Sequence, residues 1–158
     1  MSIKPKRLIN PYEERMLEFI QTCIDKTYKI HTQVSLSQFC EIDSHLENEL
    51  RKFFFSSSVD ALITDFDYKP CLVLEFQSSY HTYPEAKERD RKKAMLLELA
   101  GVSLLYTRIK DFGILHLYSK NEEVFFNLFT GEGRENAKGL IQKYCQKSVG
   151  CNLLVAAW

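Results

Sequence analysis

The sequence lacks several features that would assign it to a specialised class of protein. No apolar run approaches the ~18 residues needed to cross a membrane, so no membrane partner is expected. Neither charge is in excess, with 21 Lys and Arg against 21 Asp and Glu, so bulk charge does not indicate nucleic-acid binding. Only 6 glycines and 4 prolines occur in 158 residues, which excludes collagen-like and low-complexity chains. Any contact with nucleic acid would need a local basic patch.

The five cysteines lack the spacing of a zinc-binding or redox motif. Reduced thiols in a cytoplasmic protein are therefore the expectation. Hydrophobic residues make up 45% of the chain, enough for a buried core without a disulfide or metal staple. The length of 158 residues fits one globular domain.

The first third of the chain predicts a helix followed by a strand. Residues 10–13 (Asn-Pro-Tyr-Glu) place a capping residue, a first-turn proline and a capping-box acid at a helix start. Apolar residues then recur at helical spacing to about Lys26. The segment 28–39 is rich in β-branched and aromatic residues and predicts a strand. Residues 45–54 are predicted as a short helix or an ordered loop that covers the sheet.

The middle of the chain predicts a β-hairpin followed by a βαβ crossover. Apolar runs at 59–64 and 71–77 flank a loop rich in turn residues, which favours a hairpin. A helix is predicted from Pro84 to a C-cap at Gly101, followed by a buried strand at 102–109. The second hairpin strand and the strand after the helix should therefore run parallel.

The last part of the chain predicts a strand at 112–118, an apolar patch at 124–129 and a helix at 134–147. The predicted fold class is therefore α/β. Its mixed β-sheet has four to five strands flanked by helices, in the core order αβββαβ.

The hairpin brings two acids together. A loop centred between Asp67 and Tyr68 pairs Asp60 with Glu75, and directly opposed residues have Cβ atoms about 5 Å apart. Like charges so placed need neutralisation, which a hard divalent cation such as Mg²⁺ provides. The period of two also places Gln77 on the face of Glu75. Asp60 could instead be an ordinary acid at the start of a strand.

A basic helix follows the second acid. Glu75 lies near the carboxyl end of its strand, where α/β sheets usually bind ligands. Arg89 and Lys93 are four residues apart and share a helix face with each other. A lysine beside a metal-bound water can orient the nucleophile or stabilise developing charge. The alternative for the run 87–93 is a solvated helix face with intrahelical ion pairs.

The stretches 59–63 (Val-Asp-Ala-Leu-Ile) and 74–77 (Leu-Glu-Phe-Gln) resemble the PD-(D/E)XK nuclease superfamily, which has the restriction-endonuclease-like fold. More narrowly, the chain resembles an uncharacterised DUF branch related to very-short-patch-repair-like endonucleases. The resemblance covers about residues 10–110. It implies a single nuclease-like domain over 1–158, with a core at about 10–118 and a C-terminal extension at 119–158. The residues that match the branch are Glu13, Glu14, Gln33–Leu36, Asp60, Glu75, Ser79–His81, Arg89, Asp90 and Lys93.

The resemblance implies a Mg²⁺ or Mn²⁺ site formed by Asp60, Glu75 and the carbonyl of Phe76, with Glu13 or Glu14 close by. The sequence departs from the family at the motif lysine, where it has Gln77. Lys93 on the following helix is the expected replacement, with Gln77 assisting it to position the attacking water. The residues expected to contact nucleic acid are Arg89, Lys92, Ser79, His81 and Arg108.

Two functions follow from the resemblance. The first is metal-dependent hydrolysis of phosphodiester bonds in nucleic acid, with DNA as the expected substrate of an endonuclease. The second is an inactive nuclease-fold module that binds DNA or a partner protein. Two of the residues expected to contact nucleic acid also have a structural alternative. His81 could be a loop histidine packed on Tyr83, and Arg108 could pair with Asp111. The sequence does not distinguish DNA from RNA or a single strand from a duplex, and it allows a homodimer. A small α/β protein with an interaction role unrelated to nucleic acid is the third possible function.

Overall fold

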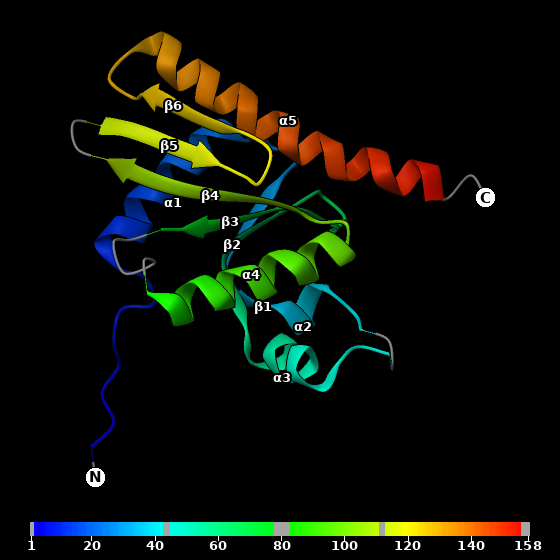
Figure 1. The fold of residues 1–158 in the computed structure, drawn as a ribbon. Helices are drawn as coiled ribbons and strands as arrows, with labels where there is room; N and C mark the ends of the chain where they lie inside the picture. The colour runs from blue at the N-terminus through cyan, green and yellow to red at the C-terminus, as the bar shows by residue number, and fades with distance from the viewer. Residues whose placement is uncertain (1, 43–44, 78–82, 111–112, 156–158) are drawn as a thin grey trace.

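Six strands form one sheet in the order in which they occur along the chain (Figure 1). The structure is a computed structural model that describes residues 2–42, 45–77, 83–110 and 113–155, with side chains described as far as 147. Its elements are α1 (Pro11–Cys23), β1 (Lys29–Ser35), α2 (Leu36–Phe39), α3 (Asn48–Ser56), β2 (Ser58–Thr64), β3 (Pro70–Phe76), α4 (Pro84–Leu99), β4 (Ser103–Lys110), β5 (Ile114–Tyr118), β6 (Glu123–Asn127) and α5 (Gly131–Val155).

The sheet is mixed. β3 and β4 run parallel, and α4 connects them. All other neighbouring strands pair antiparallel. The predicted βαβ crossover is therefore confirmed, as is an α/β fold with a mixed sheet flanked by helices.

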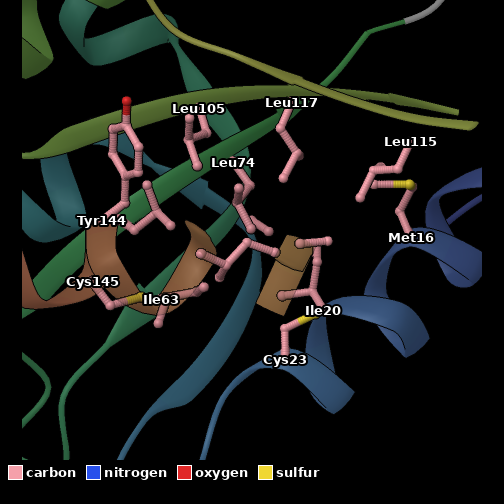
Figure 2. Packing of buried hydrophobic residues seen from close by; sticks show 14 of the residues in the cluster. Met16, Ile20, Cys23, Ile63, Leu74, Leu105, Leu115, Leu117, Tyr144 and Cys145 are labelled. Atoms are coloured by element: carbon pink, nitrogen blue, oxygen red, sulfur yellow. The ribbon is translucent and has the colours of Figure 1, made fainter. Parts of the chain in front are cut away.

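Helices cover both faces of the sheet (Figure 1). α1 and α5 pack on one face, and Figure 2 shows part of the core that they enclose with the strands. α2, α3 and α4 pack on the other face through Leu36, Phe54, Leu96 and Leu97. Because both faces of β2 and β3 are covered, nearly all of their residues are buried.

The start of α1 follows the predicted capping box. Asn10 Oδ1 accepts a hydrogen bond from the Glu13 amide at 2.8 Å, and Glu13 Oε2 accepts one from the Asn10 amide at 2.8 Å. The helix ends at Cys23 rather than near Lys26, because Ile24 is already extended, with φ −102° and ψ 148°.

Helix α4 also has the predicted boundaries. Pro84 occupies its first turn, and Gly101 follows its end with a φ of +71°, a conformation that glycine adopts without strain. The amide of Val102 donates to the carbonyl of Leu97, which closes the helix end.

Three further predictions need correction. The strand predicted at 28–39 ends at Ser35, because a capping box between Ser35 and Gln38 starts the short helix α2. The sheet has six strands rather than four to five, because β6 forms over most of the predicted apolar patch. Two hydrogen bonds to Ser119 Oγ stabilise the tight turn before it. The last helix begins at Gly131 rather than at residue 134.

Residues 45–54 are resolved in favour of the helical alternative, as α3. None of the four cysteines with described side chains forms a disulfide, and Cys23, Cys71 and Cys145 are buried. No helix within the described part of the chain is both long and apolar enough to span a membrane.

Candidate active site

The β2–β3 hairpin sets the position of two buried acids. The strands pair Ala61 with Leu74, and the same antiparallel register places Asp60 opposite Glu75. The backbone amide of Asp60 lies 3.4 Å from Glu75 Oε1, as expected for opposed residues. A register irregularity lies near the turn, on the far side of these pairs. The predicted pairing of Asp60 with Glu75 therefore follows from the observed register.

The Asp60 carboxylate has two hydrogen-bond partners, a backbone amide and a side-chain amide. Its Oδ2 accepts a hydrogen bond of 2.8 Å from the Phe76 amide, and its Oδ1 lies 3.5 Å from Gln33 Nε2. Burial raises the pKa of Asp60, while the Phe76 amide and the charge of Lys93 oppose that rise. The carboxylate is thus fixed in orientation but costly to ionise.

Glu75 is 4% exposed and pairs with Lys93. Lys93 Nζ lies 2.9 Å from Glu75 Oε2, and the lysine reaches it from α4. Burial raises the pKa of Glu75 to about 7, although the positive charge of Lys93 lowers it. Asp60 raises it further through like-charge repulsion. Lys93 therefore lies beside two acids, and the ionisation of both at once is unfavourable in the folded protein.

A pocket of about 520 Å³ opens over this pair. The start of α1, the end of α3, strands β2 and β3, and α4 all contribute to it. It brings together five of the predicted site residues with mixed charge, namely Glu13, Asp60, Glu75, Arg89 and Lys93. Phe76 also lines it. Residues distant in sequence thus converge where the sequence predicted a metal-dependent site.

Other predicted residues lie outside this pocket. Glu14 points away from the pocket, because neighbouring residues on a helix point about 100° apart. Its Oε2 pairs instead with Arg7 Nη2 at 2.7 Å. Lys92 Nζ lies 5.9 Å from the centre of the Phe53 ring. Arg108 is exposed on β4 and lies opposite His116.

Gln77 is buried and does not line the pocket. Its Nε2 lies 3.5 Å from Asp90 Oδ2. The predicted assistance of Gln77 to Lys93 has no contact to support it. Ser79 and His81 lie outside the described residues.

The donor set suits one kind of metal. No group of three or more His, Cys, Asp or Glu side chains lies within reach of a common ion in the described part of the chain. A structural zinc site is therefore not formed by these side chains. Mg²⁺ needs only one or two carboxylates and keeps several waters, and Asp60 and Glu75 border a pocket large enough for them. The residues present fit Mg²⁺ or Mn²⁺.

Comparison with known proteins assigns the sequence to a family. Residues 5–127 match DUF2726, a family described as protein of unknown function. The chain belongs to the DUF2726 family. An uncharacterized protein of Haemophilus influenzae is 30% identical over 105 residues, which cover 65% of this chain and 54% of that protein. The chain thus spans about half the length of this relative, and no solved structure matches the chain.

Within the part that matches DUF2726, the Tyr12 hydroxyl makes a contact that the sequence did not predict. In a regular parallel ladder the Gln77 carbonyl would accept a hydrogen bond from the Ile109 amide, since the Gln77 amide donates to Thr107. Instead the Ile109 amide donates to the Tyr12 hydroxyl at 3.1 Å, and that hydroxyl donates to the Gln77 carbonyl at 3.4 Å. Tyr12 lines the pocket, so its phenol connects α1 to the ends of β3 and β4 beside the site.

A second missed feature of the DUF2726 chain is the backbone of Gln33. This residue has a φ of +52°, which residues other than glycine rarely adopt. The β1–β2 register, which pairs Thr32 with Ala61, places Gln33 opposite Asp60. Such strain costs roughly 1–3 kcal/mol and is frequent at functional sites. The sequence carries no local signal for it.

Proposed function

We propose that this chain is a metal-dependent nuclease of the PD-(D/E)XK type that cleaves DNA. The observation that carries the proposal is the 2.9 Å contact of Lys93 Nζ with Glu75, beside Asp60 in one pocket. The element order α1–β1–β2–β3–α4–β4, with two short helices inserted after β1, supports a restriction-endonuclease-like core.

Asp60 and Glu75 would hold Mg²⁺ or Mn²⁺, with Glu13 on the wall of the same pocket. When bound, the ion lowers the pKa of a water and stabilises negative charge on the phosphate. The raised pKa values of both acids favour this role, because a nearby cation removes the cost of ionising them.

The remaining residues of the pocket have distinct tasks. The Lys93 ammonium lies where it can hydrogen-bond the attacking water and stabilise charge as it develops. Arg89 lies on the same helix and lines the same pocket, so it is the residue proposed to contact the phosphate. Lys93 thereby takes the place of the motif lysine of the PD-(D/E)XK superfamily, and the Gln77 amide has no part in the reaction.

The experiment is a cleavage assay on plasmid, linear and single-stranded DNA with Mg²⁺ or Mn²⁺. The wild type, Glu75→Gln and the control Glu132→Gln are compared, because Glu132 is exposed in α5, outside the pocket. We expect cleavage by the wild type and the control, its loss in EDTA, and a decrease of about 100-fold or more in Glu75→Gln. DNA binding without cleavage by the wild type would support a non-cleaving module instead.

A further inference from the structure

The sheet face that carries Glu75 continues beyond the cover of α4. The hydrophobic cluster on this face includes Leu104 of β4 and no described residue of β5 or β6. Within the described residues, no helix lies over β5 and β6 on the side of α4 (Figure 1). An open stretch of sheet therefore lies next to the candidate active site.

Aromatic side chains on this stretch are in register with the acid. Glu75 pairs with Tyr106 across β3 and β4, and Tyr106 pairs with Tyr118 across β4 and β5. The two tyrosine rings stack with centroids 5.1 Å apart. A row of side chains thus leads from Glu75 outward along one face of the sheet.

The aromatic row extends to the edge strand. The His116 ring lies 4.5 Å from the Tyr118 ring and 4.3 Å from the Phe125 ring, stacked on both. Phe125 is at the end of the row on β6 and is 49% exposed. An exposed ring at the end of a stack is the group on which an unpaired nucleobase stacks.

Two cations border this row. On β4, Arg108 and Lys110 follow Tyr106 at alternate positions, both on the same face and both exposed. Alternate residues of a strand are about 6.6 Å apart, so the two charges can contact different phosphates. Lys110 Nζ lies 4.7 Å from the centre of the Phe125 ring, which places a positive charge beside the end of the stack. Glu123 lies 2.7 Å from His116, and Asp90 and Glu75 are the acids close to the inner end of the row at Tyr106.

We propose that this surface binds an unpaired strand of nucleic acid next to the candidate active site. We name it the β4–β6 face, defined by Tyr106, Arg108, Lys110, His116, Tyr118 and Phe125. The exposed Phe125 ring at the end of the stack would contact the face of a base, which a duplex hides within its stack, and the two cations would contact phosphates. The neutral net charge fits an interaction that depends on a few local cations and stacking.

The dimensions fit a short segment of strand. Three spacings of roughly 4.8 Å separate β3 from β6, which gives about 14 Å. An unpaired strand that kept the 3.4 Å base spacing of a helix would cover this distance with about four nucleotides. The inference rests on the proposed nuclease function only for the statement that this segment continues into the cleavage site.

The test is equilibrium binding of a labelled oligonucleotide in EDTA, so that no cleavage is required. The wild type is compared with Phe125→Leu and with the double variant Arg108→Ala/Lys110→Ala. Phe125→Leu removes the ring and keeps an apolar side chain, so the fold should survive. The controls are Phe129→Leu, which changes another exposed phenylalanine, and Lys26→Ala/Lys52→Ala, which removes two exposed charges elsewhere.

We expect the wild type to bind a single strand more tightly than a duplex of the same length. Phe125→Leu should weaken single-strand binding roughly 5- to 100-fold, the range for loss of one base stack. The double variant should reduce the slope of log affinity against log salt by about 1.4, for two lost phosphate contacts. Both controls should bind as the wild type does.

Equal affinity for duplex and single strand, or unchanged binding by both test variants, would overturn the proposal. Cleavage and binding together distinguish this proposal from the proposed nuclease function. Binding that depends on the β4–β6 face without cleavage in Mg²⁺ refutes the nuclease and leaves the face intact. Cleavage with binding that is insensitive to Phe125→Leu and to the double variant refutes the face alone.

Discussion

Glu75 should make the protein less stable as the pH rises. Its pKa is raised from 4.5 to about 7 in the folded protein, because the carboxyl group is buried. Between these two values the folded protein holds a proton that the unfolded chain has released. The free energy of unfolding must therefore fall as the pH rises through this window, and it levels off above the folded pKa.

The size of the effect follows from the shift. A rise from 4.5 to about 7 corresponds to about 3 kcal/mol, at about 1.4 kcal/mol for each pK unit. Asp60 adds to the loss, since burial raises its pKa as well. The variant Glu75→Gln cannot ionise at this position, so it should lose much less stability over the same window.

The assay is urea unfolding at about pH 5 and about pH 8, with metal excluded. The shift of Glu75 alone should cost the wild type about 2–3 kcal/mol between the two conditions, because part of the loss already occurs below pH 5. Glu132→Gln, an exposed control in α5, should follow the wild type, whereas Glu75→Gln should lose much less. An equal loss in Glu75→Gln, or a wild type that becomes more stable towards pH 8, would refute the assignment of a raised pKa to Glu75.

Three further outcomes are expected. Millimolar Mg²⁺ should raise the Tm of the wild type above pH 7 and have a smaller effect on Asp60→Asn, measured by calorimetry. Tyr12→Phe should reduce the free energy of unfolding by about 1 kcal/mol and accelerate hydrogen exchange at the Ile109 amide, because its hydrogen-bond partner is lost. Gln33→Gly should be more stable than Gln33→Ala by about 1 kcal/mol in urea unfolding, since only glycine relieves the positive φ. Equal stability of these two variants would argue against strain at Gln33.

The parts of the structure that the sequence predicted best depend on local signals. The turn residues between the two strands predict the hairpin, and the register irregularity beside the turn then places Asp60 opposite Glu75. Pro84 and Gly101 mark the two ends of α4, and this helix then places Lys93 over the sheet. The convergence of Asp60, Glu75 and Lys93 therefore depends on the hairpin register as well as on the two ends of α4.

The features that the sequence did not predict depend on contacts between distant residues. The Tyr12 hydroxyl joins α1 to Gln77 and Ile109, and no local pattern encodes such a bridge. Glu13 and Glu14 look alike in sequence, and only the direction of each on the helix separates a pocket residue from one paired with Arg7. Strand β6 is a short apolar run, whose pairing with β5 decides its conformation.

The role of Lys93 is best tested by comparing the rate of Mg²⁺-dependent DNA cleavage by Lys93→Met with the rate of the matched variant Lys87→Met. Lys87 is exposed on the same helix and does not line the pocket, so its replacement removes an equal charge outside the site. The wild type and Lys87→Met should cleave at similar rates, and Lys93→Met should be slower by about 100-fold or more. Cleavage by Lys93→Met at the wild-type rate would contradict the proposed nuclease site, as would a folded wild type that binds Mg²⁺ and cleaves no nucleic acid.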